Sequence, residues 1–347
     1  MAPKTLNTLP TAFVFDVFGT VYDWRTTVST RISQLLSQKL TSLDAIGAHP
    51  SSSSSSSSSS AYQNNSKPDL STPDAISKFS KEFAQEWRDS YKDFVVTHGG
   101  TKSPLQSPDI NDNQEEVGLN NITPSIPRAT DPSEPPYTTV DTHHLQSLRG
   151  LLKKYSLFHL FSSSEIQELS RVWHSLKPWD DSKPGIEGLR ELAIVSTLSN
   201  GNLRLLVDLQ KNSGVVFDVL LSAQLWRAYK PESKVYVGSC EVLGVGGKEE
   251  WDEYIEEKGG DVKEDEDKWR FKERGKVAMV AAHIGDLRAA KACGLTTIYI
   301  ERPREDDDLE AGSNYLEEGE DWIDMWVRHD EGGILEVARR LAKLKQN

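Results

Sequence analysis

The sequence has 347 residues, which suits either two ordinary domains or one large domain that carries an insertion. Hydrophobic residues make up 37% of the chain and the mean hydropathy is −0.53, so we expect some segments to lack the apolar side chains that a packed structure needs. The net charge of −13 argues against a nucleic acid or an anionic membrane as a partner, because both bind basic surfaces.

Two further features of the sequence predict a cytoplasmic protein. The N-terminus lacks the apolar stretch of a secretion signal, and no apolar run is long enough to cross a membrane. The only two cysteines, Cys240 and Cys293, have the spacing of neither a metal site nor a redox motif. We therefore expect both thiols to be reduced and buried, as in proteins of a reducing compartment.

A short apolar, aromatic-rich run at 12–15 predicts a buried strand near the N-terminus. Asp16 follows it, and the chain then bends at Gly19 before the hydroxyl of Thr20. Open α/β sheets carry their chemistry just beyond the carboxyl ends of the strands. Asp16 is therefore a candidate nucleophile or metal ligand, although an aspartate that caps a helix explains this stretch equally well.

The region from about 25 to 180 shows helical periodicity and no convincing strand. Two polar segments interrupt it. One, at about 41–74, contains an unbroken serine run, and the other, at about 99–138, is rich in Pro, Ser, Asn and Asp. Neither has enough apolar surface to offset the entropy of ordering, so we predict a helical module with two disordered insertions.

Beyond residue 185 the pattern changes to strands that alternate with helices. The predicted strands cover 193–198, 216–221, 277–282 and 296–300. With the strand at 12–15 they predict a five-stranded parallel sheet with helices on both faces. The core would then comprise 1–24 and 185–347, with an acidic, solvated insertion at 246–275, and the helical module at 25–184 would be inserted after the first strand.

Polar side chains follow three of the predicted strands. Asp16 follows the first strand, Ser199 the second and Asp286 the strand at 277–282. Because the carboxyl ends of parallel strands meet at the same edge of a sheet, we expect these side chains to converge on one cleft. This convergence favours a functional role for Asp16 over a capping one.

Four segments in this order, FDVFGTVYDW, TLSNGN, AYKPESKVY and MVAAHIGDLRAAKACG, resemble the motifs of the haloacid dehalogenase (HAD) superfamily. Within it they look most like the type II L-2-haloacid dehalogenases. The resemblance implies a Rossmann-like core and a helical cap domain that corresponds to the inserted module. It covers the core and most of the cap, and it leaves out the polyserine, Pro-rich and acidic insertions.

Two positions separate this chain from the phosphatases of the same superfamily. Those enzymes carry a second acid two residues after the first aspartate, where this chain has Phe18, and usually an acid for Mg²⁺ where it has Ala282. A halide leaves without a proton, whereas an alkoxide needs one. Asp16 and Asp286 alone would serve a hard octahedral cation poorly. We therefore expect metal-independent chemistry on a carbon–halogen bond, without a cofactor.

By resemblance, the mechanism is nucleophilic catalysis through an ester. Asp16 attacks the carbon that carries the halogen from the rear and releases halide, and water then hydrolyses the aspartyl ester. Lys230 orients Asp16, while Asp286 pairs with Lys230 and helps to position the water.

The same resemblance assigns residues to substrate binding. Arg88 and Asn200 would cradle the departing halide, and Thr20 and Ser199 would hold the carboxylate of the nucleophile or of the substrate. Taken alone, Arg88 and Lys230 would be surface cations, but the AYKP context of Lys230 favours a functional role. A strand-to-helix cap is the less favoured explanation of Ser199 and Asn200.

Three more candidate residues have roles that the sequence leaves open. Tyr236 matches a tyrosine that supports the site in the family, and a packed helix tyrosine explains it equally well. His283 stands where the better-known members have asparagine, so it is either a base or a hydrogen-bonding substitute. Phe18 would supply an apolar wall, and a dry site strengthens a carboxylate nucleophile.

The sequence thus predicts a hydrolase of the 2-haloacid dehalogenase type that acts on short 2-haloacids as its small-molecule substrates. A divergent phosphatase and a non-catalytic binding protein with the same fold are the alternatives. Phe18 and Ala282 count against the phosphatase, and the presence of Asp16, Lys230 and Asp286 counts against the binding protein. Many relatives pair through the cap or the core, so we also expect a homodimer.

Overall fold

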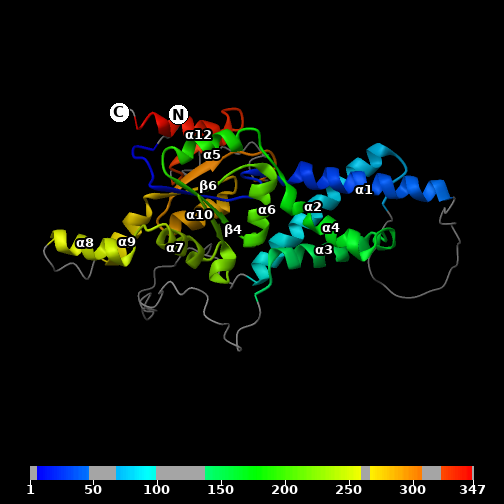
Figure 1. Ribbon diagram of the computed structural model, residues 1–347, viewed down its shortest axis with the longest axis horizontal. Helices are drawn as coiled ribbons and strands as arrows, with labels where there is room; N and C mark the ends of the chain where they lie inside the picture. The colour runs from blue at the N-terminus through cyan, green and yellow to red at the C-terminus, as the bar shows by residue number, and fades with distance from the viewer. Residues whose placement is uncertain (1–5, 47–67, 99–136, 259–265, 307–321, 346–347) are drawn as a thin grey trace.

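The computed structural model describes residues 6–46, 68–98, 137–258, 266–306 and 322–345 (Figure 1). Most of the two predicted disordered insertions, and part of the acidic one, lie outside the described residues. In the described ranges, no helix combines the length and the apolar character that crossing a bilayer requires. Cys240 and Cys293 are both free and buried, as predicted.

Six parallel strands form the central sheet, in the order β5-β4-β1-β6-β7-β8. They are β1 (Ala12–Phe15), β4 (Ile194–Ser199), β5 (Val219–Ser222), β6 (Val277–Ala281), β7 (Thr296–Ile300) and β8 (Met325–Val327). The predicted parallel sheet is confirmed, but the predicted count of five strands is wrong, because β8 adds an edge strand beside β7. The strand order reverses around β1, and such a switch point is where open α/β sheets bind their ligands.

Strand β1 is buried on both faces, and its side chains alternate between two layers of helices. Phe13 and Phe15 belong to the apolar cluster of one face, and Ala12 and Val14 to that of the other. The helices α5 (Ser182–Arg190), α6 (Leu203–Ser213) and α12 (Gly333–Ala342) cover the first face, and α7 (Ser233–Val242) and α10 (Ile284–Ala292) cover the second. The core is therefore a three-layer α/β arrangement with β1 at its centre.

Helices occupy most of the segment at 24–180, as its periodicity predicted, and they lie together on one side of the sheet (Figure 1). They are α1 (Trp24–Ile46), α2 (Pro73–His98), α3 (Val140–Lys154) and α4 (Ser163–Ser170), with the short helices η1 (Phe158–Leu160) and η2 (Arg171–Ser175). The predicted absence of strands there is wrong in one detail, because β2 (Tyr22–Asp23) pairs antiparallel with β3 (Lys177–Pro178). This pairing joins the two ends of the helical segment. We refer to α1–α4, η1 and η2 as the cap.

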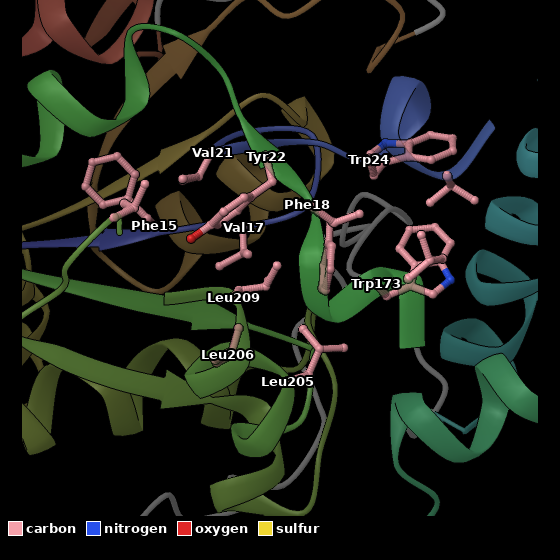
Figure 2. Packing of buried hydrophobic residues seen from close by; sticks show 14 of the residues in the cluster. Phe15, Val17, Phe18, Val21, Tyr22, Trp24, Trp173, Leu205, Leu206 and Leu209 are labelled. Carbon is pink, nitrogen blue, oxygen red and sulfur yellow. The ribbon is translucent and has the colours of Figure 1, made fainter. Parts of the chain in front are cut away.

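Aromatic side chains carry the hydrophobic core from the sheet into the cap (Figure 2). Phe18, just beyond β1, meets Trp173 of η2 edge to face, with ring centroids 6.1 Å apart. Trp173 stacks on Trp24 at 5.8 Å and meets Trp87 of α2 edge to face at 5.5 Å. Because Trp24, Trp87 and Trp173 are all fully buried, their packing stabilises the cap over the end of β1.

The charged segment after α7 is more ordered than the predicted solvated insertion. It contains α8 (Lys248–Lys258) and α9 (Glu266–Arg274), which lie on the side of the core away from the cap (Figure 1). Trp251 is buried between the two helices, 5.4 Å from the ring of Tyr254 and 5.3 Å from that of Trp269. These three aromatic rings explain why a segment so rich in charge still forms helices that pack.

Candidate active site

Asp16 lies directly beyond β1, and its side chain is buried at the centre of the sheet edge. The hydroxyl of Thr20 donates to Oδ2 of Asp16 at 2.8 Å. Gly19 makes this contact possible because its φ of +83° turns the chain back toward Asp16. Thr20 also accepts a hydrogen bond from the backbone N–H of Ala282 at 2.9 Å, which ties the turn to the end of β6.

Lys230 joins the two carboxylates that the sequence singled out. It follows η3 (Ala223–Trp226) after β5, and its Nζ donates to Oδ1 of Asp16 at 2.9 Å and to Oδ2 of Asp286 at 2.5 Å. The hydroxyl of Tyr236 donates to the other oxygen of Asp286, also at 2.5 Å. The structure thus places Asp16, Lys230, Asp286 and Tyr236 in one buried hydrogen-bonded chain.

The charges in this chain are set by burial and by its neighbours. Burial alone would raise the pKa of Asp16, but the nearby charges of Lys230 and His283 outweigh it and hold this pKa well below its usual range. Burial would lower the pKa of Lys230, but the two carboxylates beside it raise this pKa above its usual value. Burial and the proximity of Asp16 raise the pKa of Asp286. Asp16 is therefore the ionised carboxylate of the site and Lys230 its permanent cation.

His283 lies between two carboxylates. Its Nδ1 is 3.0 Å from Oδ2 of Asp16, and its Nε2 is 3.1 Å from Oε2 of Glu305. Burial would lower the pKa of His283, but the hydrogen bonds to Asp16 and Glu305 raise it to about 10. Both ring nitrogens therefore carry a proton and donate. In this state of the free protein His283 is an imidazolium that donates a hydrogen bond to each carboxylate.

Ser199 and Asn200 hold the loop after β4 in shape. Oγ of Ser199 accepts from the backbone N–H of Gly201 at 3.1 Å. The side chain of Asn200 accepts from the backbone N–H of Lys230 at 2.6 Å and donates to its carbonyl at 3.2 Å. Within the described residues neither side chain is hydrogen-bonded to Asp16, so Thr20 alone of the two predicted hydroxyls holds that carboxylate. Asn200 instead fixes the backbone from which Lys230 reaches the site.

Arg88 is buried on α2, where its guanidinium lies 4.6 Å from the centroid of Tyr91 and 5.8 Å from that of Trp24. No carboxylate of the described residues forms an ion pair with it. A buried cation that rests only on aromatic rings retains most of its capacity to bind an anion. Its place against Trp24, whose ring stacks on Trp173 beside Phe18, puts this charge at the aromatic wall of the site.

Two residues of the site, Tyr91 and Glu305, were not among the candidates predicted from the sequence. Tyr91 is buried, and burial raises its pKa against the opposing effects of Arg88 and of a hydrogen bond with Asn200. Its helical spacing from Trp87 indicated only a buried helix face. Glu305 lies on the loop after β7, 22 residues beyond His283, and no sequence pattern connects the two.

The donor set around Asp16 does not suit a divalent cation. Among the described residues, the side chains within hydrogen-bonding distance of its carboxylate are Lys230, His283 and Thr20, and the first two are cations. They would repel Mg²⁺, which prefers oxygen ligands. In the part of the chain that the structure describes, no group of three or more His, Cys, Asp or Glu side chains is arranged to hold a metal ion.

No protein-family profile and no curated protein sequence matches this chain. Solved structures do match along almost all of it. The defluorinating L-2-haloacid dehalogenase Rha0230 is 26% identical with a TM-score of 0.57, over 96% of this chain and 95% of that one. The L-2-haloacid dehalogenase PA0810 is 23% identical with a TM-score of 0.58, over 97% and 100%. The L-2-haloacid dehalogenase from Xanthobacter autotrophicus, with chloropropionic acid covalently bound, is 15% identical with a TM-score of 0.53, over 96% and 99%.

Proposed function

We propose that this chain, whose fold is like that of the L-2-haloacid dehalogenases, is a hydrolase that cleaves the carbon–halogen bond of short 2-haloacids. The likeness to Rha0230, at 26% identity over nearly the whole chain, supports the hydrolase class. The choice of a carbon–halogen bond rests on the chemistry of the site itself.

The observation that carries the proposal is the carboxylate of Asp16. It is buried and ionised, and it lies between the cations Lys230 and His283. Such a carboxylate is a weak base, yet it remains available as a nucleophile toward carbon at every physiological pH. Phe18, two residues on, is an apolar ring packed on Trp173, so no acid stands there to protonate an alcohol leaving group.

In the proposed first step, one carboxylate oxygen of Asp16 attacks the carbon that bears the halogen from the side opposite the halogen. The carbon–halogen bond breaks with both electrons going to the halide, and a neutral aspartyl ester forms. Arg88 supplies a buried positive charge for the halide, and its guanidinium lies against the rings of Tyr91 and Trp24. Water then attacks the ester carbonyl, releases the 2-hydroxyacid and restores Asp16.

The same site is less suited to a phosphatase. Phosphoryl transfer in this arrangement needs a divalent cation beside the nucleophile and an acid for the leaving group. The cations beside Asp16 disfavour the divalent cation, and Ala282 occupies the position of the acid that would hold it. Phe18 occupies the position of the acid for the leaving group. A binding protein without activity would have no need for an ionised carboxylate held by three donors in a buried site.

The test is halide release from a panel of 2-chloro-, 2-bromo- and 2-fluoroacids in the presence of EDTA. We expect release by the wild type that chelation does not affect and that Asp16→Asn abolishes. Asp89→Asn is the matched control, because Asp89 is half exposed on the same helix as Arg88 and outside the site. Mg²⁺-dependent phosphate release from phosphate esters without any halide release would establish the phosphatase instead. Inactivity in both assays would favour the binding protein.

Two further parts of the proposal concern the surroundings of the enzyme. We propose a homodimer, as the resemblance in sequence led us to expect, and light scattering of the purified chain measures it. The two free thiols, Cys240 and Cys293, agree with a reducing compartment such as the cytoplasm. Neither part bears on the chemistry at Asp16.

A further inference from the structure

His283 and Glu305 form a second polar chain that leads away from Asp16 on the side opposite Lys230. Oδ2 of Asp16 faces Nδ1 of His283, and Nε2 of His283 faces Oε2 of Glu305, at 3.0 and 3.1 Å. The side chain of Glu305 is only 4% exposed. A carboxylate is costly to bury, so its presence behind a histidine that touches the nucleophile calls for a function.

The position of Glu305 is fixed from several directions. Trp24 of the cap donates its indole N–H to Oε1 of Glu305 at 2.9 Å. On the other side, Gly19 leaves room for the carboxylate, since a Cβ there would overlap it. The neighbouring residue Asp306 accepts from the backbone N–H of Ile284 at 2.8 Å, which ties the loop to the start of α10. Glu305 is thus as firmly placed as the residues that contact Asp16 directly.

The charge balance around His283 changes when Asp16 reacts. Before the reaction, two anionic carboxylates hold the imidazole in its doubly protonated form. Once Asp16 has become a neutral ester, one of these anions is gone and only Glu305 remains. The imidazolium is then less stabilised and loses its Nδ1 proton more readily, while Nε2–H stays hydrogen-bonded to Glu305. The freed Nδ1 points at the carboxyl group that now carries the ester.

We propose that His283 is the general base for hydrolysis of the Asp16 ester, and that Glu305 is the positioning residue that keeps its Nε2–H tautomer. This inference rests on the proposed function and adds a group that takes the proton from water. It also explains how a residue that is an acid in the free enzyme becomes a base only when a base is needed. Alkylation of Asp16 thus changes His283 from an acid into a base.

The proton balance of the cycle closes without any further reactant. Alkylation breaks the carbon–halogen bond and releases halide, and His283 then releases one proton to solvent. Nδ1 of His283 takes a proton from water as the hydroxide adds to the ester carbonyl. The tetrahedral intermediate expels the alkoxide, which takes that proton from His283 and leaves as the 2-hydroxyacid. Asp16, left as a carboxylic acid, returns its proton to His283 and restores the starting ion pair.

The experiment compares His283→Asn and Glu305→Gln with the wild type, and with Glu301→Gln as the matched control. Glu301 carries the same change on the same loop, but it contacts Trp326 and His329, away from Asp16. Halide release is followed in the first turnover and at steady state, and intact mass spectrometry measures the ester on the protein. We expect both variants to release about one halide per enzyme in a burst, and to hydrolyse the ester about 100-fold (His283→Asn) or about 10-fold (Glu305→Gln) more slowly.

The pH profile of ester hydrolysis separates positioning from a structural role. In the wild type the rate should rise with pH as His283 loses its proton. Glu305→Gln should move this rise to lower pH, because removal of the negative charge lowers the pKa of the imidazole. His283→Asn should lose the ionisation altogether, and the profile of Glu301→Gln should match the wild type.

The possible outcomes separate the roles of His283 and Glu305 from the dehalogenase proposal. Accumulation of ester in both variants together with the shifted profile supports the base and its positioning residue. Wild-type hydrolysis by His283→Asn, or a Glu305→Gln variant that slows alkylation and hydrolysis equally without a pH shift, overturns this inference while the dehalogenase proposal stands. The absence of halide release by the wild type overturns both.

Discussion

Lys230 and Asp16 form a buried ion pair, with Nζ of Lys230 2.9 Å from Oδ1 of Asp16, although 214 residues separate them in the chain. The central place of β1 in the sheet and the hydrogen bonds of Asn200 to the backbone of Lys230 bring the two together. The same Nζ contacts Asp286, so one cation is shared by two buried carboxylates. The pair therefore contributes to the stability of the fold, apart from its role in the proposed chemistry.

Lys230→Met leaves both carboxylates buried without their cation, and we expect it to lower the free energy of unfolding by about 3–5 kcal/mol near neutral pH. The pKa of Asp16 is lower in the folded than in the unfolded chain. The contribution of Asp16 to the stability is thus present above its pKa in the unfolded chain, about 3.9, and is lost as pH falls through its lower pKa in the folded chain. Urea unfolding should show the difference from the wild type shrinking below about pH 4.

The control for this variant is Lys234→Met, which removes a half-exposed lysine of α7 that pairs with Glu232, the residue before this helix. It should cost less than about 1 kcal/mol. A Lys230→Met protein as stable as this control would contradict the assignment of a buried, charged network.

Much of this arrangement was predictable from local patterns. The apolar run before Asp16 and the strands near Ser199 and Asp286 fixed the positions of three candidate residues at one edge of the sheet. Strand β8 was missed because three apolar residues after an acidic stretch are too short for a strand pattern. The helices α8 and α9 were missed because charge concealed the spacing of Trp251 and Tyr254.

The contacts between distant loops were not predictable. Glu305 faces His283 only because β7 lies beside β6, which brings the loops that follow the two strands together, and no spacing in the sequence encodes that distance. Similarly, the helical periodicity of α2 placed Tyr91 on a buried face. It did not show that Arg88 and Asn200 lie against this tyrosine. Side-chain partners of this kind depend on the tertiary packing. Sequence patterns predict the class of fold, but not which side chains touch.

Arg88→Gln should lower kcat/KM for a 2-haloacid about 10- to 100-fold, the value of a charge-assisted contact to an anion. The wild type should also gain thermal stability from added bromide, since an ion that binds only the folded state stabilises it, and the variant should lose this gain. Arg31→Gln is the matched control, because Arg31 is exposed on the cap and paired with Glu168. Equal bromide effects in wild type and Arg88→Gln would exclude Arg88 as the halide ligand.

His174 connects the cap to the core through two carboxylates. Its Nε2 lies 2.9 Å from Asp141 of α3 and its Nδ1 lies 2.9 Å from Asp208 of α6, which Arg204 also contacts. Burial would lower the pKa of His174, but the two aspartates raise it above its usual value. Since the pKa is raised on folding, this contribution to stability is complete below about pH 6.5 and is lost as pH rises through the folded value.

His174→Gln should therefore lower the free energy of unfolding by about 1.5–3 kcal/mol near pH 6, and by less near pH 9. Urea unfolding at the two pH values measures this difference. His159→Gln, which changes an exposed histidine of the cap, should show no such dependence. A loss that grows with pH would mean that His174 is buried in its neutral form.

Gly19→Ala tests the packing of Glu305 against the turn that follows Asp16. A Cβ at Gly19 would overlap the Glu305 carboxylate, and the φ of +83° adds backbone strain of about 1–2 kcal/mol. Gly244→Ala is the matched control, because Gly244 has a φ of +70° with no heavy atom near the added Cβ. Both variants should lose similar stability from strain, but only Gly19→Ala should displace Glu305 from His283.

We therefore expect Gly19→Ala to accumulate the Asp16 ester when it is incubated with a 2-haloacid, with intact mass spectrometry as the measurement. Gly244→Ala should turn over at the wild-type rate despite its lower stability. Both variants carry the stability cost of alanine at a positive φ. A difference in turnover between them therefore reports the displacement of Glu305. Full turnover by Gly19→Ala would mean that the turn tolerates a Cβ without moving Glu305, or that the place of Glu305 does not matter to hydrolysis. A crystal structure of the variant decides between these two.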